Sequence, residues 1–223
     1  MNDNVISIDV EYPATKSSTF ATGYRSKKPR ACIKLTTERT RERSIWVPTR
    51  VARQFMKEKP ALPCAPEAIA QSVDTLEAKT ALVYLTEMLG RRDHSVGEAR
   101  EKLITAGYHE AAIEHALERA QTLRFLDDAR FSAYFIEERK RRGWGKRKIE
   151  LELKRKHVKC EDIPGYPEAY FSQEDDYTRA RELISHKTIP ETKPFEKLVR
   201  FLMGKGFPYS LSADVVKEYL ASE

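Results

Sequence analysis

The chain has 223 residues, with 40 Lys and Arg against 34 Asp and Glu, and a formal net charge of +6. No apolar run approaches the roughly 18 residues that a membrane span needs, and the start, Met1–Asn4, lacks the basic and apolar regions of a secretory signal. Cys32, Cys64 and Cys160 are scattered and form no CxxC pair, which argues against a disulfide framework and a structural zinc site. We expect a soluble, cytoplasmic, reduced protein with no membrane contact, bound metal or cofactor.

The first part of the chain has the alternating pattern of β-strands. Apolar residues alternate with polar ones over 6–12 and again over 31–35, and residues 44–47 form another β-prone piece. The polar stretch 36–43 between the last two fits a hairpin loop. This pattern predicts a small sheet near the N-terminus.

A short helix and a proline cluster follow these strands. Thr49 is placed to cap a helix that runs through Met56, and residues 59–66 hold three prolines. Such a cluster breaks regular structure and is typical of a linker. We therefore interpret residues 1–72 as a basic, partly β N-terminal extension that ends in a Pro-rich linker.

From Asp74 onward the apolar period changes to that of helices. Ser95, with Glu98 three residues later, forms a capping box, and Gly107 is placed to end the same helix. Adjacent acids at 127 and 128 are interpreted as a helix cap rather than as paired catalytic carboxylates. The predicted helices span 76–89, 96–106, 111–123, 128–142 and 146–157.

The helices repeat along the chain with a spacing of 50 and then 49 residues. Two columns keep this shift: Leu85, Phe135 and Ile184 form one, and Leu103, Leu153 and Leu202 form the other. The predicted fold class is mainly α, with three tandem three-helix repeats in an elongated array behind the small β-containing extension. The repeats cover 73–126, 127–173 and 174–223, and the Pro-Gly-Tyr-Pro stretch at 163–167 interrupts the third helix of the middle repeat.

Positive charge gathers in two blocks. Residues 16–57 hold 12 Lys and Arg against Glu38 and Glu42, and residues 139–159 hold 11 against Glu150 and Glu152. Two basic blocks in an otherwise acidic chain favour a polyanionic partner, above all a nucleic acid. For the first block, an equally good interpretation is that its charges only form the solvent-exposed face of a helix.

Leu126-Asp-Asp-Ala-Arg-Phe131, followed by Arg142-Gly-Trp-Gly145, resembles the signature of the RecX regulatory proteins, and the resemblance extends from Thr75 to Leu220. It implies a monomeric, non-enzymatic modulator of the RecA recombinase, with roles in homologous recombination, DNA repair and the SOS response. Such proteins bind the RecA filament on single-stranded DNA and suppress filament growth, ATP hydrolysis and strand exchange. An array of helical repeats suits a long polymeric partner.

The candidate site for recombinase or DNA is the second basic block. Trp144, between two glycines that bring the flanking helix ends together, is interpreted as a packing residue in preference to a base-stacking one. No catalytic motif is present. Two alternatives remain: a sequence-nonspecific nucleic-acid-binding helical protein, and a helical scaffold for an unrelated protein. The candidate binding residues are Arg139, Lys140, Arg141, Arg142, Lys146, Arg147, Lys148 and Arg155.

Overall fold

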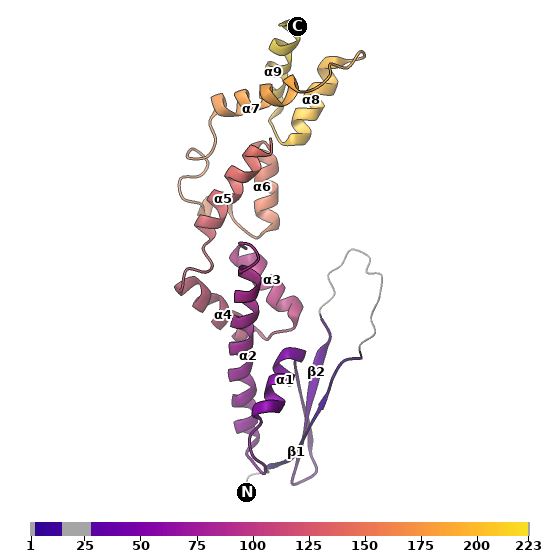
Figure 1. Ribbon diagram of the computed structural model, residues 1–223, viewed down its shortest axis with the longest axis vertical. Helices are drawn as coiled ribbons and strands as arrows, with labels where there is room; N and C mark the ends of the chain where they lie inside the picture. The colour runs from indigo at the N-terminus through magenta and orange to yellow at the C-terminus, as the bar shows by residue number, and fades with distance from the viewer. Residues whose placement is uncertain (1–2, 15–27, 223) are drawn as a thin grey trace. The chain divides into compact units, whose positions relative to one another are not determined.

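The structure, a computed structural model, describes residues 3–14 and 28–222. They belong to two compact units, Met1–Leu126 and Asp127–Glu223. The predicted class is confirmed: the fold is mainly α with a small N-terminal sheet (Figure 1). Within the described ranges, no helix is both long and apolar enough to cross a membrane. Residues 16–27 of the first basic block lie outside the residues that the structure describes.

The N-terminal sheet is antiparallel, in the order β1 (Val5–Glu11), β2 (Arg30–Thr37) and β3 (Glu42–Pro48). The three predicted strands are therefore confirmed. Their alternation places Ile33 on the inner face, opposite Val10 and Ile45 on the neighbouring strands. Ile33 is fully buried, because one face of such a sheet must be covered by another element.

Two helices follow the sheet, and both start differently from the prediction. Helix α1 (Thr49–Glu58) has Pro48 as its N-cap residue and no side-chain cap, so the predicted capping role of Thr49 is wrong. Helix α2 (Pro66–Leu89) begins before Asp74, because proline fits the first turn of a helix, where its missing N–H is not needed. The segment between α1 and α2 is also fixed, since the backbone of Cys64 bonds to that of Val5 at 2.8 Å.

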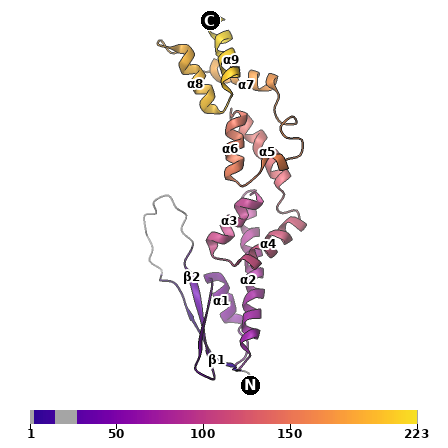
Figure 2. The same cartoon turned by 180° about the vertical axis from the view of Figure 1, so that it is seen from behind.

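One hydrophobic core joins the sheet to the first repeat. Helix α1 lies between the sheet and α2 (Figures 1 and 2), and α3 (Val96–Ala106) and α4 (Glu110–Thr122) complete the unit. Ile33, Phe55, Leu85 and Leu103 belong to a single buried cluster. The apolar faces of the sheet and of α1 are therefore buried against the helices of the first repeat, and not in a core of their own.

The second unit carries the other two repeats. The middle one contains α5 (Asp128–Arg141), α6 (Lys146–Arg155) and the 3-10 turn η1 (Cys160–Asp162). The last contains α7 (Gln173–Ser185), α8 (Pro194–Lys205) and α9 (Tyr209–Ala221). As expected from the acidic pair, the Asp127 carboxylate accepts a hydrogen bond from the Arg130 N–H at 2.9 Å. The interruption expected at 163–167 is also present, because turns rather than a helix follow η1.

The second helix of each repeat ends in the same way. Leu103, Leu153 and Leu202 are fully buried. A residue of positive φ follows each helix, at +91° for Gly107, +59° for His157 and +101° for Gly206. The next N–H then donates back to the leucine carbonyl, at 3.3 Å from Tyr108, 3.0 Å from Val158 and 3.2 Å from Phe207. This Schellman-type ending supports the 50- and 49-residue register.

Candidate functional site

A short turn, Gly143–Gly145, connects α5 to α6 in the middle of the candidate segment. Gly143 has a φ of +75°, which favours glycine. Gly145 has an ordinary φ of −83°, but a Cβ there would lie 2.5 Å from the backbone carbon of Gly206. The close approach at Gly145 is thus between the middle and last repeats, and not between the ends of α5 and α6 as predicted.

Backbone hydrogen bonds hold this junction. The N–H of Gly145 donates to the Lys205 carbonyl at 2.8 Å, and the N–H of Arg147 donates to the Gly206 carbonyl at 3.1 Å. The start of α6 therefore meets the end of α8. A helix N-terminus attracts phosphate only where its N–H groups are free, so this one is already occupied by protein.

Trp144 packs within the second unit. It is half-buried against the core of the middle repeat. The Arg139 guanidinium and the Lys148 ammonium both lie over its ring, at 5.0 Å and 4.3 Å from the ring centre. Its carbonyl accepts a hydrogen bond from Arg179 at 2.8 Å. These contacts support the packing interpretation over base stacking.

Two of the predicted binding residues, Arg139 and Lys140, make contacts within the protein that stabilise the fold. The Arg139 side chain is 22% exposed and donates to the Glu138 carboxylate at 2.7 Å. The Lys140 side chain is 15% exposed, and its ammonium contacts the Tyr170 carbonyl at 2.7 Å and the Asp175 carboxylate at 3.2 Å. A polyanion would have to break these contacts to reach either cation.

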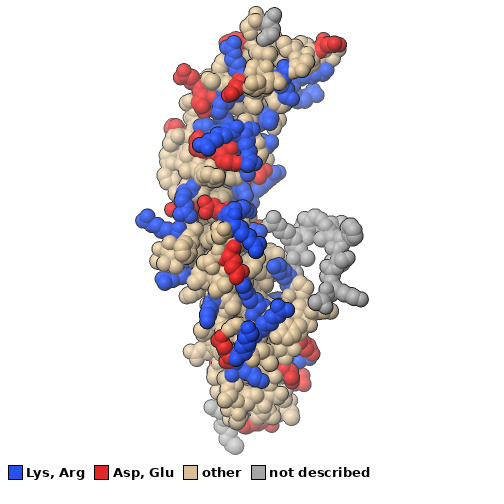
Figure 3. Space-filling model, in the orientation of Figure 1, with Lys and Arg blue, Asp and Glu red and all other residues tan. Residues whose placement is uncertain are grey.

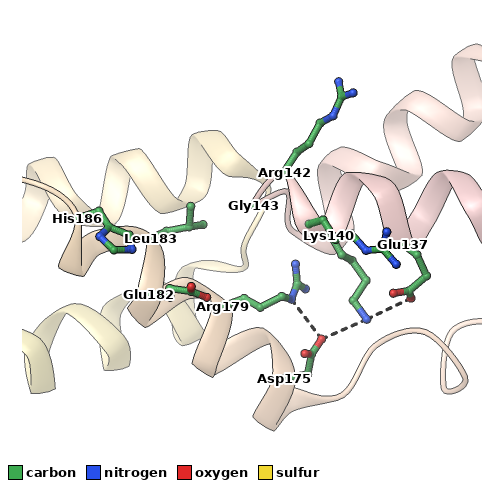
Figure 4. Close-up of a pocket in the computed structure, with 10 residues that line it drawn as sticks. Glu137, Lys140, Arg142, Gly143, Asp175, Arg179, Glu182, Leu183 and His186 are labelled. Atoms are coloured by element: carbon green, nitrogen blue, oxygen red, sulfur yellow. Dashed lines mark hydrogen bonds and ion pairs between the residues drawn. The ribbon is translucent and has the colours of Figure 1, made fainter.

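A mixed-charge pocket of about 410 Å³ lies between α5 and α7. Lys140 and Arg179 converge on Asp175, whereas Arg142 points away from this cluster (Figure 4). Burial raises the pKa of the neighbouring Asp176, and the positive charge of Arg179 opposes that rise. Lys140, Arg142 and Arg179 in this lining are already paired with carboxylates, and Arg141 alone of its Lys and Arg residues forms no ion pair in the described parts of the chain. The pocket is therefore better suited to joining the two repeats than to holding an anion.

Three of the other six predicted cations also have acidic neighbours. Arg142 pairs with Glu138, Arg155 lies 2.5 Å from Glu152, and Lys146 lies 4.0 Å from Glu150. In the second unit, Lys and Arg side chains on the visible face are interspersed with Asp and Glu (Figure 3). Among the predicted residues, Arg141 and Arg147 are exposed and, within the described parts of the chain, form no ion pair.

The exposed side of α6 brings together three cations, of which Arg147 and Lys154 form no ion pair in the described parts of the chain. Ile149 and Leu153 face the core, and the opposite side of the helix carries the i, i+7 and i+8 positions Arg147, Lys154 and Arg155. All three are exposed around Leu151, which is itself 50% exposed. We call Arg147, Leu151, Lys154 and Arg155 the α6 basic face. Lys154 was missing from the candidate residues, although the helical period points to it.

Arg179 is the structural residue that the candidate set missed. It lies on α7 and joins the carbonyl of Trp144 to the carboxylates of Asp175 and Asp176. No local pattern indicates this role, because Trp144 lies 35 positions away in the sequence.

Comparison with known proteins places the chain in a family. Residues 127–163 match the family model described as RecX, second three-helix domain. The Regulatory protein RecX of Haemophilus ducreyi is 35% identical over 131 residues, which cover 57% of this chain and 85% of that protein. The chain belongs to the RecX family. The Regulatory protein RecX of Vibrio parahaemolyticus is 31% identical over 140 residues, covering 60% of this chain and 86% of the relative.

Solved RecX structures share the fold. A RecX crystal structure from Lactobacillus salivarius matches with a TM-score of 0.54 and 17% identity, over 64% of this chain and 96% of that one. A second crystal structure, of a regulatory protein RecX, matches with a TM-score of 0.59 and 16% identity, over 97% of this chain and 99% of that one. The second match therefore includes the N-terminal sheet.

The RecX family model and the candidate site cover the same segment of the chain. The matched second three-helix domain comprises α5, α6 and η1, and it contains every predicted binding residue and the α6 basic face. Because the RecX relatives are named regulatory proteins, a regulatory role is supported for this chain.

Proposed function

We propose that this protein binds the filament that a RecA recombinase forms on single-stranded DNA and lowers the activity of the recombinase. It acts as a cytoplasmic monomer, without catalysis or cofactor. Membership of the RecX family supports the regulatory role. The observation that carries the binding proposal is the α6 basic face, which presents Arg147 and Lys154 without acidic partners in the described parts of the chain.

The chemistry of the α6 basic face suits a phosphate backbone. Lysine and arginine contacts with phosphates release counterions, which gives affinity that does not depend on sequence and falls with salt. Because protein carbonyls occupy the N-terminus of α6, phosphates would be held by side chains along the helix. This favours recognition of charge and shape over reading of base sequence.

The first test is ATP hydrolysis by the cognate recombinase on single-stranded DNA, with and without this protein. We expect inhibition at well below one copy per recombinase, because one bound molecule can stop growth at a filament end. Unchanged hydrolysis under conditions where the protein binds bare DNA tightly would instead favour the sequence-nonspecific nucleic-acid-binding alternative.

The second test reverses charge on the α6 basic face. The double variant Arg147→Glu, Lys154→Glu should weaken binding to filaments, and each lost phosphate contact should reduce the salt slope for single strands by about 0.7. Both side chains are exposed, so stability should change by less than about 0.5 kcal/mol.

A matched control carries the same charge change elsewhere in the second unit. Arg181 on α7 and Lys217 on α9 are also exposed. The double variant Arg181→Glu, Lys217→Glu should bind and inhibit like the wild type. Equal losses in both double variants would mean that net charge alone matters, and the assignment of the α6 basic face would then be wrong.

A further inference from the structure

An apolar groove of about 570 Å³ lies along α8 at the start of α9. Its apolar floor is formed by Phe195, Val199, Met203 and Tyr209. Gly204 also lines it, and a Cβ built there meets no atom within 4 Å. The backbone of α8 is therefore open to close approach at this point.

Two large apolar side chains of the groove floor are exposed to solvent. Met203 is 44% exposed and Tyr209 is 58% exposed. Single exposed apolar residues are common, but these two line the same hollow. Methionine adapts its shape to different partners, and tyrosine supplies a large, rigid contact area, so both are typical of protein-binding surfaces.

One rim of the groove is basic. Arg200 lines the groove, Lys197 lies one turn before it on the same side of α8, and Lys193 is the N-cap residue of this helix. All three are exposed, and in the described parts of the chain none forms an ion pair. Lys197 donates to the Thr192 hydroxyl at 2.9 Å, which leaves its charge uncompensated.

We infer that this groove binds an acidic segment of the recombinase that inserts an apolar side chain between Met203 and Tyr209. The basic rim complements the acidic residues of that segment, and the floor buries its apolar anchor. This inference rests on the proposed function and adds to it: the groove holds the protein component of the filament, while the α6 basic face meets phosphates.

The composition of the groove favours a protein over a nucleic acid. Glu196 also lines it, so the acidic side chains of the bound segment must lie along the basic rim, which separate charges on a peptide can do and the closely spaced charges of a phosphate backbone cannot. Of the two aromatic residues of the floor, Phe195 is half-buried and Tyr209 is the exposed one. A strand of stacked bases needs several accessible aromatic faces.

The test uses the full-length protein and two probes: recombinase filaments on a fluorescent oligonucleotide, held with a slowly hydrolysed ATP analogue, and the same oligonucleotide without recombinase. The variant Met203→Ala, Tyr209→Ala removes the exposed floor, and Gly204→Trp fills the groove from a position that is open to solvent. The variant Lys197→Glu, Arg200→Glu reverses the rim. Arg181→Glu, Lys217→Glu is the charge-matched control.

We expect each groove variant to bind filaments about tenfold more weakly, as loss of an interface anchor does, with unchanged affinity for the bare oligonucleotide. The rim variant should also flatten the salt dependence of filament binding. Thermal unfolding followed by circular dichroism should show no loss of stability, because the substituted positions are exposed and replacement of the helical Gly204 removes a poor helix former.

Three outcomes would overturn the inference. Wild-type filament binding by all groove variants, with loss only in the α6 variant, would refute the groove and leave the proposed function intact. Parallel loss of filament and oligonucleotide binding would identify the occupant as nucleic acid. Failure of the wild-type protein to bind filaments would refute the proposed function and the groove together.

Discussion

The junction between the middle and last repeats can be tested by replacing each of two glycines with alanine. We expect one replacement to lower the free energy of unfolding and the other to raise it. Alanine at Gly145 would place its Cβ 2.5 Å from the backbone carbon and 2.6 Å from the backbone oxygen of Gly206. A flexible side chain could change its rotamer to avoid this contact, but backbone atoms cannot. The start of α6 and the end of α8 must therefore move apart. Since the φ of −83° at Gly145 is open to any residue, the penalty comes from this contact and from the helix cap.

The expected loss can be worked from the bonds at this junction. Opening it breaks the hydrogen bonds from Gly145 to Lys205 and from Arg147 to Gly206, each contributing about 1 kcal/mol. Alanine is also a poorer N-cap residue than glycine, which adds up to about 1 kcal/mol. Gly145→Ala should therefore lower the free energy of unfolding of the second unit by about 3 kcal/mol.

Gly204→Ala is the matched control. Gly204 lies in α8 and has open space around its missing Cβ, so alanine should stabilise the helix by about 1 kcal/mol. Urea unfolding followed by Trp144 fluorescence, in a Trp46→Phe background, reports on the second unit. The reasoning is refuted if Gly145→Ala unfolds within about 0.5 kcal/mol of the wild type, or if both alanines destabilise alike.

Three further predictions follow from the fold. Leu103→Ala, Leu153→Ala and Leu202→Ala should each cost about 2–5 kcal/mol in chemical denaturation, because all three side chains are fully buried; a near-zero loss at any two would contradict the repeat register. His157→Gly should raise the free energy of unfolding by up to about 1 kcal/mol, because it relieves a φ of +59°, whereas His157→Ala should give no gain. Limited trypsin digestion should cut first near the exposed Arg124, between the two units, and leave the sheet attached to the first repeat, since one core holds both. Release of a stable fragment that starts near residue 66 would contradict the shared core.

Much of the fold could be predicted from the sequence because its signals are local. Alternation over a few residues identified the strands, and the helical period identified the helices of the first two repeats. The capping role of Ser95 needed only the residue three positions later, and its hydroxyl accepts the Glu98 N–H at 3.1 Å. The register of the repeats followed from the fixed spacing of buried leucines, which the helix endings support.

The binding site could be predicted only in part, because sequence shows where cations are and not what they contact. Lys140 belongs to the same basic run as Arg141, yet only Lys140 has partners far along the chain: the Tyr170 carbonyl, 30 positions away, and the Asp175 carboxylate, which neutralises its charge. Local spacing does not encode such distances. The helical period alone was enough to place Arg147 and Lys154 on the exposed side of α6, opposite the core.

The tertiary structure decided how the parts pack. Gly145 meets Gly206, which is distant in the sequence, because the start of one helix satisfies its N–H groups with the carbonyls that end another. The sheet shares a core with the first repeat because its apolar face has no other element to cover it. The groove on α8 exists because Met203 and Tyr209, on different helices, expose apolar surface at the same place. Periodicity fixes which side of each element is apolar, and only packing in three dimensions fixes which apolar and charged groups remain free for a partner.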